Sequence, residues 1–231
     1  MKLHRFYIGN TELAHEFWTS DERLFHQWTR VLRFQPAQQL ILFNDKKEER
    51  QYEVVKLGTD AVHLKMVTKL VAKEPKRELY LCFSLLKKDK NEWVLQKATE
   101  LGVRHFVPIM SDRTEKAGFD MERARKIVIE AAEQCGRSDI PRVREPLRLE
   151  TAITELSPHA ELYIAEQAST QSSTLDPKSA TALAVFIGPE GGWSDREKAF
   201  FTEQQVRHIS ISDFTLRAET ACISAAVLLM Q

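Results

Sequence analysis

The arrangement of apolar and polar residues divides the chain into two parts, and the first part predicts mainly β-strands. Apolar runs or alternating patterns bounded by turn residues predict strands at residues 40–43, 51–57 and 62–66. Gly58-Thr59-Asp60 separates the second of these strands from the third and predicts a hairpin. Within this part, apolar residues recur at helical spacing over residues 21–33. Residues 1–72 are therefore expected to form a small β-barrel with one helix.

The second part, residues 73–231, alternates strand-like and helix-like patterns after a charged stretch that contains Pro75 and predicts a linker. Strands are predicted at residues 79–84, 103–110, 161–165, 182–187 and 206–211, helices at 91–101, 120–135, from 195 onward and at 222–230, and a loop with a helical turn at 167–179. Such alternation is typical of a mainly parallel sheet with helices on both faces. The expected fold class of this part is therefore α/β.

The run Gly188-Pro189-Glu190-Gly191-Gly192 lies between the apolar strand 182–187 and a helix predicted to begin near Asp195. Ser194 and Glu197 have the spacing of a capping box, which fixes that helix start. Glycines in a strand-to-helix turn let a ligand approach the backbone, and ligands bind at such turns in α/β proteins. The turn has neither the Lys-Ser/Thr of a P-loop nor the spacing of a dinucleotide fingerprint, and its carboxylate would repel phosphate. A tight turn with only a structural role is the alternative.

Composition excludes some classes of protein. The 231 residues are 43% hydrophobic and 29% charged, as in ordinary soluble globular proteins, and no apolar run approaches the length of a membrane span. The formal net charge is zero, with a small basic excess over residues 1–73 that by itself does not establish nucleic-acid binding. Cys82, Cys135 and Cys222 have no metal-site spacing, and the first residues lack the apolar core of a signal peptide. We therefore expect reduced thiols, a cytoplasmic location and no metal site.

A second motif, Leu216-Arg217-Ala218-Glu219-Thr220-Ala221, precedes the last apolar helix. Together with residues 187–197 it resembles the SPOUT-class RNA methyltransferases, most closely the ribosomal small subunit methyltransferase E family, which methylates N3 of a uridine (uridine 1498) in 16S rRNA. Further agreement lies at residues 4–6, 30–33, 93–102 and 133–137. The resemblance implies a PUA-like RNA-binding β-barrel domain over residues 1–72. Over residues 73–231 it implies a SPOUT-type domain with a deep trefoil knot.

The resemblance also implies that three loops at strand ends bind S-adenosyl-L-methionine. Backbone groups in such loops can hydrogen-bond an adenine edge and a ribose without special side chains. The expected cofactor-binding residues are Ala165, Glu166, Ile187, Gly188, Glu190, Gly191, Gly192, Ile211, Ser212, Leu216 and Ala218. Glu190 could accept a hydrogen bond from a ribose hydroxyl or offset the sulfonium charge. Its alternative role is that of a carboxylate favoured by the dipole of the following helix.

Arg217 and Glu219 are the candidate catalytic residues. Methyl transfer is an in-line displacement in which the protein mainly aligns the reactants, and the uridine N3 proton has to leave. Arg217 could stabilise the developing anion or bind a phosphate, and Glu219 could be a base or orient the substrate. Alternatively, the two side chains pair with each other or cap the last helix. The candidate RNA-binding residues, which would supply affinity through phosphate contacts, are Arg5, Arg30, Arg33, Lys87, Lys88 and Arg137.

The chain departs from the family pattern at Ser212-Asp213-Phe214, where the family usually has a Gly and a Pro-Arg pair. Asp213 places a negative charge beside the expected cofactor loop. Two other functions are compatible with the motifs: a SPOUT methyltransferase that acts on a ribose 2′-hydroxyl or a tRNA base, and a non-catalytic RNA-binding protein of the same fold. The expected partners are 16S rRNA or the assembled small ribosomal subunit. The resemblance also implies a homodimer, and the apolar last helix agrees with this, because its surface is too large to be buried within one protomer.

Overall fold

The computed structural model describes residues 3–114, 118–166 and 181–230, and the chain groups into two compact units. The first unit comprises Met1–Glu74 and Ala132–Ile140, and the second comprises Pro75–Ala131 and Pro141–Gln231. The sequence analysis assigned residues 132–140 to the second part of the chain. In the structure this segment packs with the first unit, so that unit is built from two separate stretches of chain.

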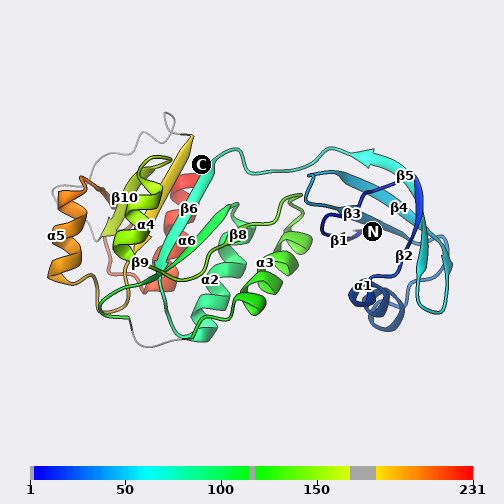
Figure 1. Ribbon diagram of the computed structural model, residues 1–231, viewed down its shortest axis with the longest axis horizontal. Coiled ribbons are helices and arrows are strands. Elements are labelled where there is room, and N and C mark those ends of the chain that lie inside the picture. Colours follow the sequence, from blue (N-terminus) through cyan, green and yellow to red (C-terminus); the bar gives the residue numbers. More distant parts are fainter. Residues whose placement is uncertain (1–2, 115–117, 167–180, 231) are drawn as a thin grey trace. The chain divides into compact units, whose positions relative to one another are not determined.

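The first unit is built on a five-stranded sheet with the strand order β1-β3-β4-β5-β2 (Figure 1). Its elements are β1 (His4–Tyr7), β2 (Glu16–Thr19), α1 (Glu22–His26), a π-helical segment (Gln27–Val31), β3 (Gln39–Phe43), β4 (Glu49–Leu57) and β5 (Val62–Leu70). β1 runs parallel to β3, and the other neighbours are antiparallel, so the sheet is mixed. The strands predicted at 40–43, 51–57 and 62–66 are confirmed, and so is the hairpin between the last two.

The helix predicted over residues 21–33 begins as expected but is shorter. Oδ1 of Asp21 accepts a hydrogen bond from the backbone N–H of Leu24 at 2.8 Å, which caps α1. After α1 the chain widens into a π-helical turn, in which the N–H of Leu32 donates to the carbonyl of Gln27. This turn keeps Trp28 fully buried in the core of the unit, where it makes an edge contact with Phe6 at 5.3 Å.

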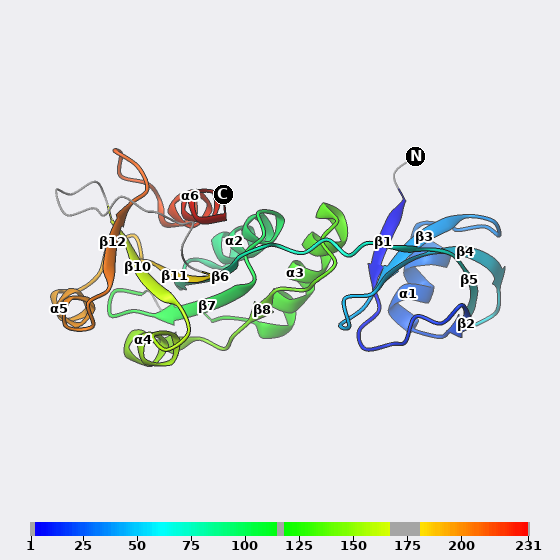
Figure 2. The ribbon, with the colours of Figure 1, turned by 90° about the horizontal axis from the view of Figure 1, so that it is seen from above.

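The second unit contains a seven-stranded sheet with the order β12-β10-β11-β6-β7-β8, and β9 also pairs with β7. Its elements are β6 (Glu78–Ser84), α2 (Lys88–Glu100), β7 (His105–Met110), α3 (Met121–Cys135, whose last residues group with the first unit), β8 (Arg142–Val143), β9 (Leu147–Arg148), α4 (Leu149–Leu156), β10 (Glu161–Glu166), β11 (Ala182–Ile187), α5 (Asp195–Glu203), β12 (Arg207–Ser210) and α6 (Ala218–Met230). All pairings in this sheet are parallel. Figure 2 shows α2 and α6 on one face and α4 and α5 on the other. The predicted parallel sheet with helices on both faces is therefore confirmed.

The two faces of the sheet are packed differently. On the α4–α5 face, Phe186, Trp193 and Phe201 form an aromatic group in which the ring centroids of Trp193 and Phe201 are 5.0 Å apart. On the other face, α6 buries mainly small residues such as Ala225 and Ala226. Small side chains let α6 lie close to α2, β6 and β11, which are its packing partners.

Parallel strands place all their C-terminal ends at one edge of the sheet, so the loops after β6, β7, β10, β11 and β12 meet there. The predicted loop at 167–179 lies outside the described residues. Within the described residues, no helix is both long enough and apolar enough to cross a membrane, and no group of His, Cys, Asp and Glu side chains could hold a metal ion. The edge where the loops meet is the place to look for a functional site.

Candidate active site

The glycine-rich loop after β11 is fixed by steric requirements. A Cβ atom on Gly188 would lie 3.1 Å from Nε1 of Trp193, whose indole packs against the loop. Gly192 has φ +68°, a left-handed conformation that favours glycine, and its N–H donates to the carbonyl of Pro189 at 2.8 Å. Trp193 is buried, and its Nε1 has no hydrogen-bond partner among the described residues. The glycines therefore keep the backbone of this loop accessible beside a buried indole.

The predicted capping box at the start of α5 is confirmed, and it also binds a neighbouring loop. The side chain of Ser194 accepts from the N–H of Glu197, and the Glu197 carboxylate accepts from the N–H of Ser194 at 2.7 Å. The other carboxylate oxygen of Glu197 accepts from the N–H of Asp112, at 2.9 Å, in the loop after β7. The Asp112 carboxylate in turn accepts from the Arg196 guanidinium and from Ser194 Oγ, and these bonds lower the Asp112 pKa. The buried carboxylate of Glu197 thus joins the loop after β7 to the loop after β11.

Arg113 adds a second connection between these loops, because its Nη1 donates to the carbonyl of Gly191 at 2.7 Å. Neither Asp112 nor Arg113 belongs to a motif that the sequence singles out. Both follow the predicted strand 103–110 at its C-terminal end, and polar residues directly after a parallel strand would have been a usable signal.

Lys90 in α2 joins the two motifs that the sequence analysis identified. Its Nζ lies 3.0 Å from Oε1 of Glu190 in the glycine-rich loop and 3.4 Å from Oε2 of Glu219 in the first turn of α6. The hydrogen bond with Glu190 raises the pKa of Lys90 and lowers that of Glu190. Oε2 of Glu219 is buried, and its ion pair with Lys90 is long for a hydrogen bond. One ammonium therefore holds two carboxylates together.

The loop between β12 and α6 presents Arg217 to solvent. The carbonyl of Arg217 accepts from the N–H of Ala221, which places Arg217 at the start of α6. Among the described residues, its guanidinium has no ion pair, and Glu219 pairs with Lys90 instead. The structure therefore does not support the alternative in which Arg217 and Glu219 pair with each other. In the same loop, Ser212 Oγ accepts from the N–H of Phe214 at 3.0 Å, and the Phe214 side chain is 79% exposed.

The expected cofactor-binding residues all lie at the ends of three adjacent strands, β12, β10 and β11. Ala165 and Glu166 are at the end of β10, where the backbone of β12 pairs with them. Ile187 ends β11, and Gly188, Glu190, Gly191 and Gly192 follow it; Ile211, Ser212 and Leu216 follow β12, and Ala218 begins α6. By sequence this group contains two acidic residues, Glu166 and Glu190, and no cationic one. Such loops fit a neutral or cationic ligand that binds through backbone groups.

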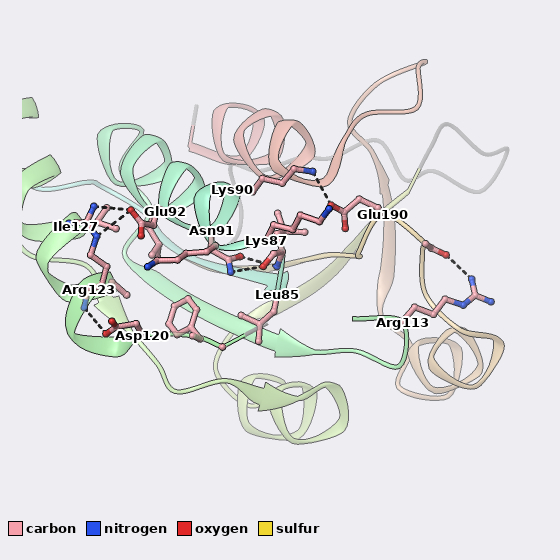
Figure 3. Close-up of a pocket in the computed structure, with 17 residues that line it drawn as sticks. Leu85, Lys87, Lys90, Asn91, Glu92, Arg113, Asp120, Arg123, Ile127 and Glu190 are labelled. Carbon is pink, nitrogen blue, oxygen red and sulfur yellow. Dashed lines mark hydrogen bonds and ion pairs between the residues drawn. The ribbon is translucent and has the colours of Figure 1, made fainter. Parts of the chain in front are cut away.

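A cavity of about 1070 Å³ lies beside this group, between α2, α3 and the loop after β7 (Figure 3). Glu190 and Gly191 form one wall of the cavity. The glycine-rich loop therefore belongs both to the cavity and to the group of expected cofactor-binding residues. Lys87 and Lys88, two expected RNA-binding residues, line the cavity and are exposed. Arg123 of α3, which no sequence motif singles out, also lines the cavity.

The structure corrects two of the expected RNA contacts, Arg5 and Arg137. Arg5 forms an ion pair with the buried carboxylate of Glu49 and donates to the carbonyl of Arg137 at 3.1 Å. Arg137 donates twice to Asp139, at 2.8 and 2.6 Å, and both side chains are buried. Buried, paired guanidinium groups are not available to phosphates, so these residues instead hold the segment 132–140 to the first unit. Arg30 and Arg33 are exposed in that unit.

Comparisons with known proteins agree with this geometry. The family model described as an RNA methyltransferase domain matches residues 72–230, and the one described as an RNA methyltransferase PUA domain matches residues 29–67. The chain is similar to the ribosomal RNA small subunit methyltransferase E of Aquifex aeolicus, with 32% identity over 73% of this chain and 75% of that one. Its similarity to the Bacillus subtilis protein of that name is 29% identity over 87% and 84% of the two chains. A Legionella pneumophila protein solved in complex with the bound cofactor SAM has 28% identity and a TM-score of 0.87, over 99% and 97% of the two chains.

Proposed function

We propose a reaction for this chain from one premise, which is that it belongs to the ribosomal RNA small subunit methyltransferase E family of RNA methyltransferases. The reaction is the transfer of a methyl group from S-adenosyl-L-methionine to N3 of a uridine in 16S rRNA, at the family's target, uridine 1498. The observation that carries the proposal is the meeting of both sequence motifs at one sheet edge, where Lys90 joins Glu190 to Glu219.

The three loops after β10, β11 and β12 would hold the cofactor, through the residues described above. S-adenosyl-L-methionine supplies an electrophilic methyl group on a sulfonium when it is bound. The steric fit of Gly188 against Trp193 and the left-handed Gly192 support this assignment, because they keep backbone donors and acceptors exposed to a ligand. Glu190 would contribute negative charge beside a cationic ligand.

Arg217 and Glu219 would act on the uridine. In the transfer, the bond from sulfur to the methyl carbon breaks, a bond from N3 to that carbon forms, and the N3 proton leaves. Glu219 would orient the base or accept this proton, and Lys90, whose Nζ lies 3.4 Å from Oε2 of Glu219, would keep the carboxylate in place. The exposed guanidinium of Arg217 would stabilise the negative charge that develops on the base.

Two finer features of the fold are also part of the proposal. β12 lies at one edge of the sheet, whereas α6 packs against α2, β6 and β11 nearer its middle. After β12 the chain would therefore return across the ends of β10 and β11. This return supports a deep trefoil knot in a SPOUT-type domain over residues 73–231. Residues 1–72 would form a PUA-like RNA-binding barrel, supported by the mixed sheet and by the match at residues 29–67.

The partners would be 16S rRNA in the assembled small ribosomal subunit and a second copy of the chain, in the cytoplasm where ribosomes are made. Arg30, Arg33, Lys87 and Lys88 remain the proposed phosphate contacts. Support for a homodimer comes from α6, where Val227 and Leu228 are 40% and 38% exposed. Light scattering that gives the mass of one chain in dilute solution would contradict the homodimer.

The test is a methylation assay with labelled S-adenosyl-L-methionine and small subunits from a strain that lacks this protein. We expect 3-methyluridine at a single site in 16S rRNA. Arg217→Ala should lower kcat by about 100-fold or more without changing cofactor affinity. Arg125→Ala, an exposed arginine on α3, is the matched control and should leave kcat unchanged.

The outcomes separate the alternatives. Label on a ribose or on tRNA would support another SPOUT activity. Undetectable binding of S-adenosyl-L-methionine by calorimetry would support a non-catalytic RNA-binding protein.

A further inference from the structure

We propose that the cavity between α2 and α3 receives the target nucleotide after it has left the base stack of the RNA. This inference rests on the proposed function and adds the place where the substrate base would bind. An enzyme that modifies N3, an atom used in base pairing, has to act on a base that is unpaired or turned out of its helix. The cavity's position, lining and charge all fit such a base and its phosphate.

The position fits because the cavity and the proposed cofactor loops share a wall. Glu190 and Gly191 line the cavity, and the same loop continues from Gly188, at the end of β11. In-line transfer needs the acceptor atom within contact distance of the methyl group. A base in this cavity would therefore lie next to the loop that holds the donor.

The lining fits a nucleobase. Leu85, Leu86, Leu95 and Ile127 form an apolar surface and are all at most 7% exposed. Phe119 adds a half-buried aromatic ring, and nucleobases stack on such rings whatever their sequence. The volume of about 1070 Å³ accommodates a nucleotide together with parts of its neighbours.

The charge at the rim fits the phosphates of that nucleotide. Five cations and three carboxylates line the cavity among the described residues. Lys87 and Lys88 are exposed and have no ion pair among the described residues; Lys87 is the N-cap of α2, where the helix dipole also favours an anion. These two lysines can therefore contact phosphate without first breaking an internal ion pair.

The walls of the cavity are held at a fixed separation. Arg123 of α3 donates to Oε2 of Glu92 on α2 through both Nε and Nη2, at 3.2 and 2.8 Å (Figure 3). Arg113 binds the carbonyl of Gly191 on the opposite side. Because the cavity is preformed, little ordering of the protein is needed when a base enters it.

The experiment compares Lys88→Glu and Phe119→Ala with the control Lys126→Glu. Lys126 is an exposed lysine on α3 that does not line the cavity. Lys88→Glu should raise the KM for small subunits by about tenfold, because a phosphate contact becomes a repulsion, and it should leave the calorimetric Kd for S-adenosyl-L-methionine within about twofold. Phe119→Ala should also raise this KM, and Lys126→Glu should behave like the unchanged protein.

A second measurement does not depend on turnover. Subunits carrying 4-thiouridine at the methylated position would be irradiated with the unchanged protein, and the cross-linked peptide identified by mass spectrometry. Cross-links within residues 85–95 or 118–127, or to Arg113, Glu190 or Gly191, are expected, because all of these line the cavity. Cross-links elsewhere in the second unit, equal KM values for Lys88→Glu and Lys126→Glu, or a weaker cofactor affinity at constant KM would each overturn the proposal. If the unchanged protein methylates no RNA, the proposed function itself fails and this inference with it.

Discussion

Glu197 is the residue whose replacement should show most directly what holds the glycine-rich loop in place. Its side chain is fully buried, and each carboxylate oxygen accepts one backbone N–H, from Asp112 and from Ser194. Glu197→Ala removes both acceptors at once. Two N–H groups that belong to different loops then lose the acceptor that the buried Glu197 side chain provides.

The size of the effect follows from these two bonds. A buried donor left without an acceptor costs about 1–3 kcal/mol, and loss of half a capping box adds up to about 1 kcal/mol. Glu197→Ala should therefore lower the free energy of unfolding by about 3 kcal/mol or more. Glu197→Gln should be similarly harmful, because the amide keeps only one acceptor oxygen and turns an NH₂ group toward the other N–H. Glu203→Ala, at the exposed end of the same helix, should change it by no more than about 0.5 kcal/mol.

Urea unfolding followed by tryptophan fluorescence measures these differences, since Trp193 is buried beside the loop. The Kd for S-adenosyl-L-methionine should also rise for Glu197→Ala, because the loops after β7 and β11 lose their connection. Equal stabilities of the Glu197→Ala and Glu203→Ala variants would refute this account of the loop.

Three further predictions test other parts of the molecule. Arg5→Met should lower the free energy of unfolding by about 3–5 kcal/mol, because Glu49 would keep a buried charge without its partner; an unchanged Tm in calorimetry would contradict this. Burial lowers the pKa of His105 from 6.5 to about 4, so the imidazole takes up a proton more readily in the unfolded chain than in the folded one. The free energy of unfolding should therefore fall by up to about 3 kcal/mol as the pH drops from 6.5 to 4. His105→Phe should lose less stability over that range, and equal losses would disprove the assignment. Gly188→Ala should cost about 1–3 kcal/mol through its contact with Trp193 and weaken cofactor binding; a normal Kd in calorimetry would count against it.

Elements with a strong local pattern could be predicted from the sequence. The strand at residues 182–187 matches β11, because a fully buried parallel strand is apolar at every position. The start of α5 was fixed by its capping box. β1 and β2 were missed because each has only four residues, too few for alternation to stand out, and they form by pairing with β3 and β5. Their formation depends on partners far along the chain.

In the candidate site, too, features with a local sequence pattern could be predicted, and features that depend on distant parts of the chain could not. The motifs predicted the loops that meet at the sheet edge, because parallel topology brings strand ends together. The roles of single charged residues could not be predicted, because the amino-acid sequence does not show whether a cationic side chain is buried. Arg5 and Arg137 are enclosed in ion pairs, whereas Lys90, placed between two carboxylates, was not selected.

The contribution of residues 132–140 to the first unit has a consequence for how the protein is made. Glu49 needs Ser138, whose hydroxyl donates to it, and the N–H of Tyr7 needs the carboxylate of Glu133 at 2.9 Å. A ribosome adds about 5–20 residues per second, so residue 140 follows residue 74 by roughly 3 to 13 s. During that interval the first unit exists as a nascent chain with an incomplete core. The final folding step of the first unit therefore waits for translation of α3. Although most of this unit is synthesised first, it cannot complete its fold until then.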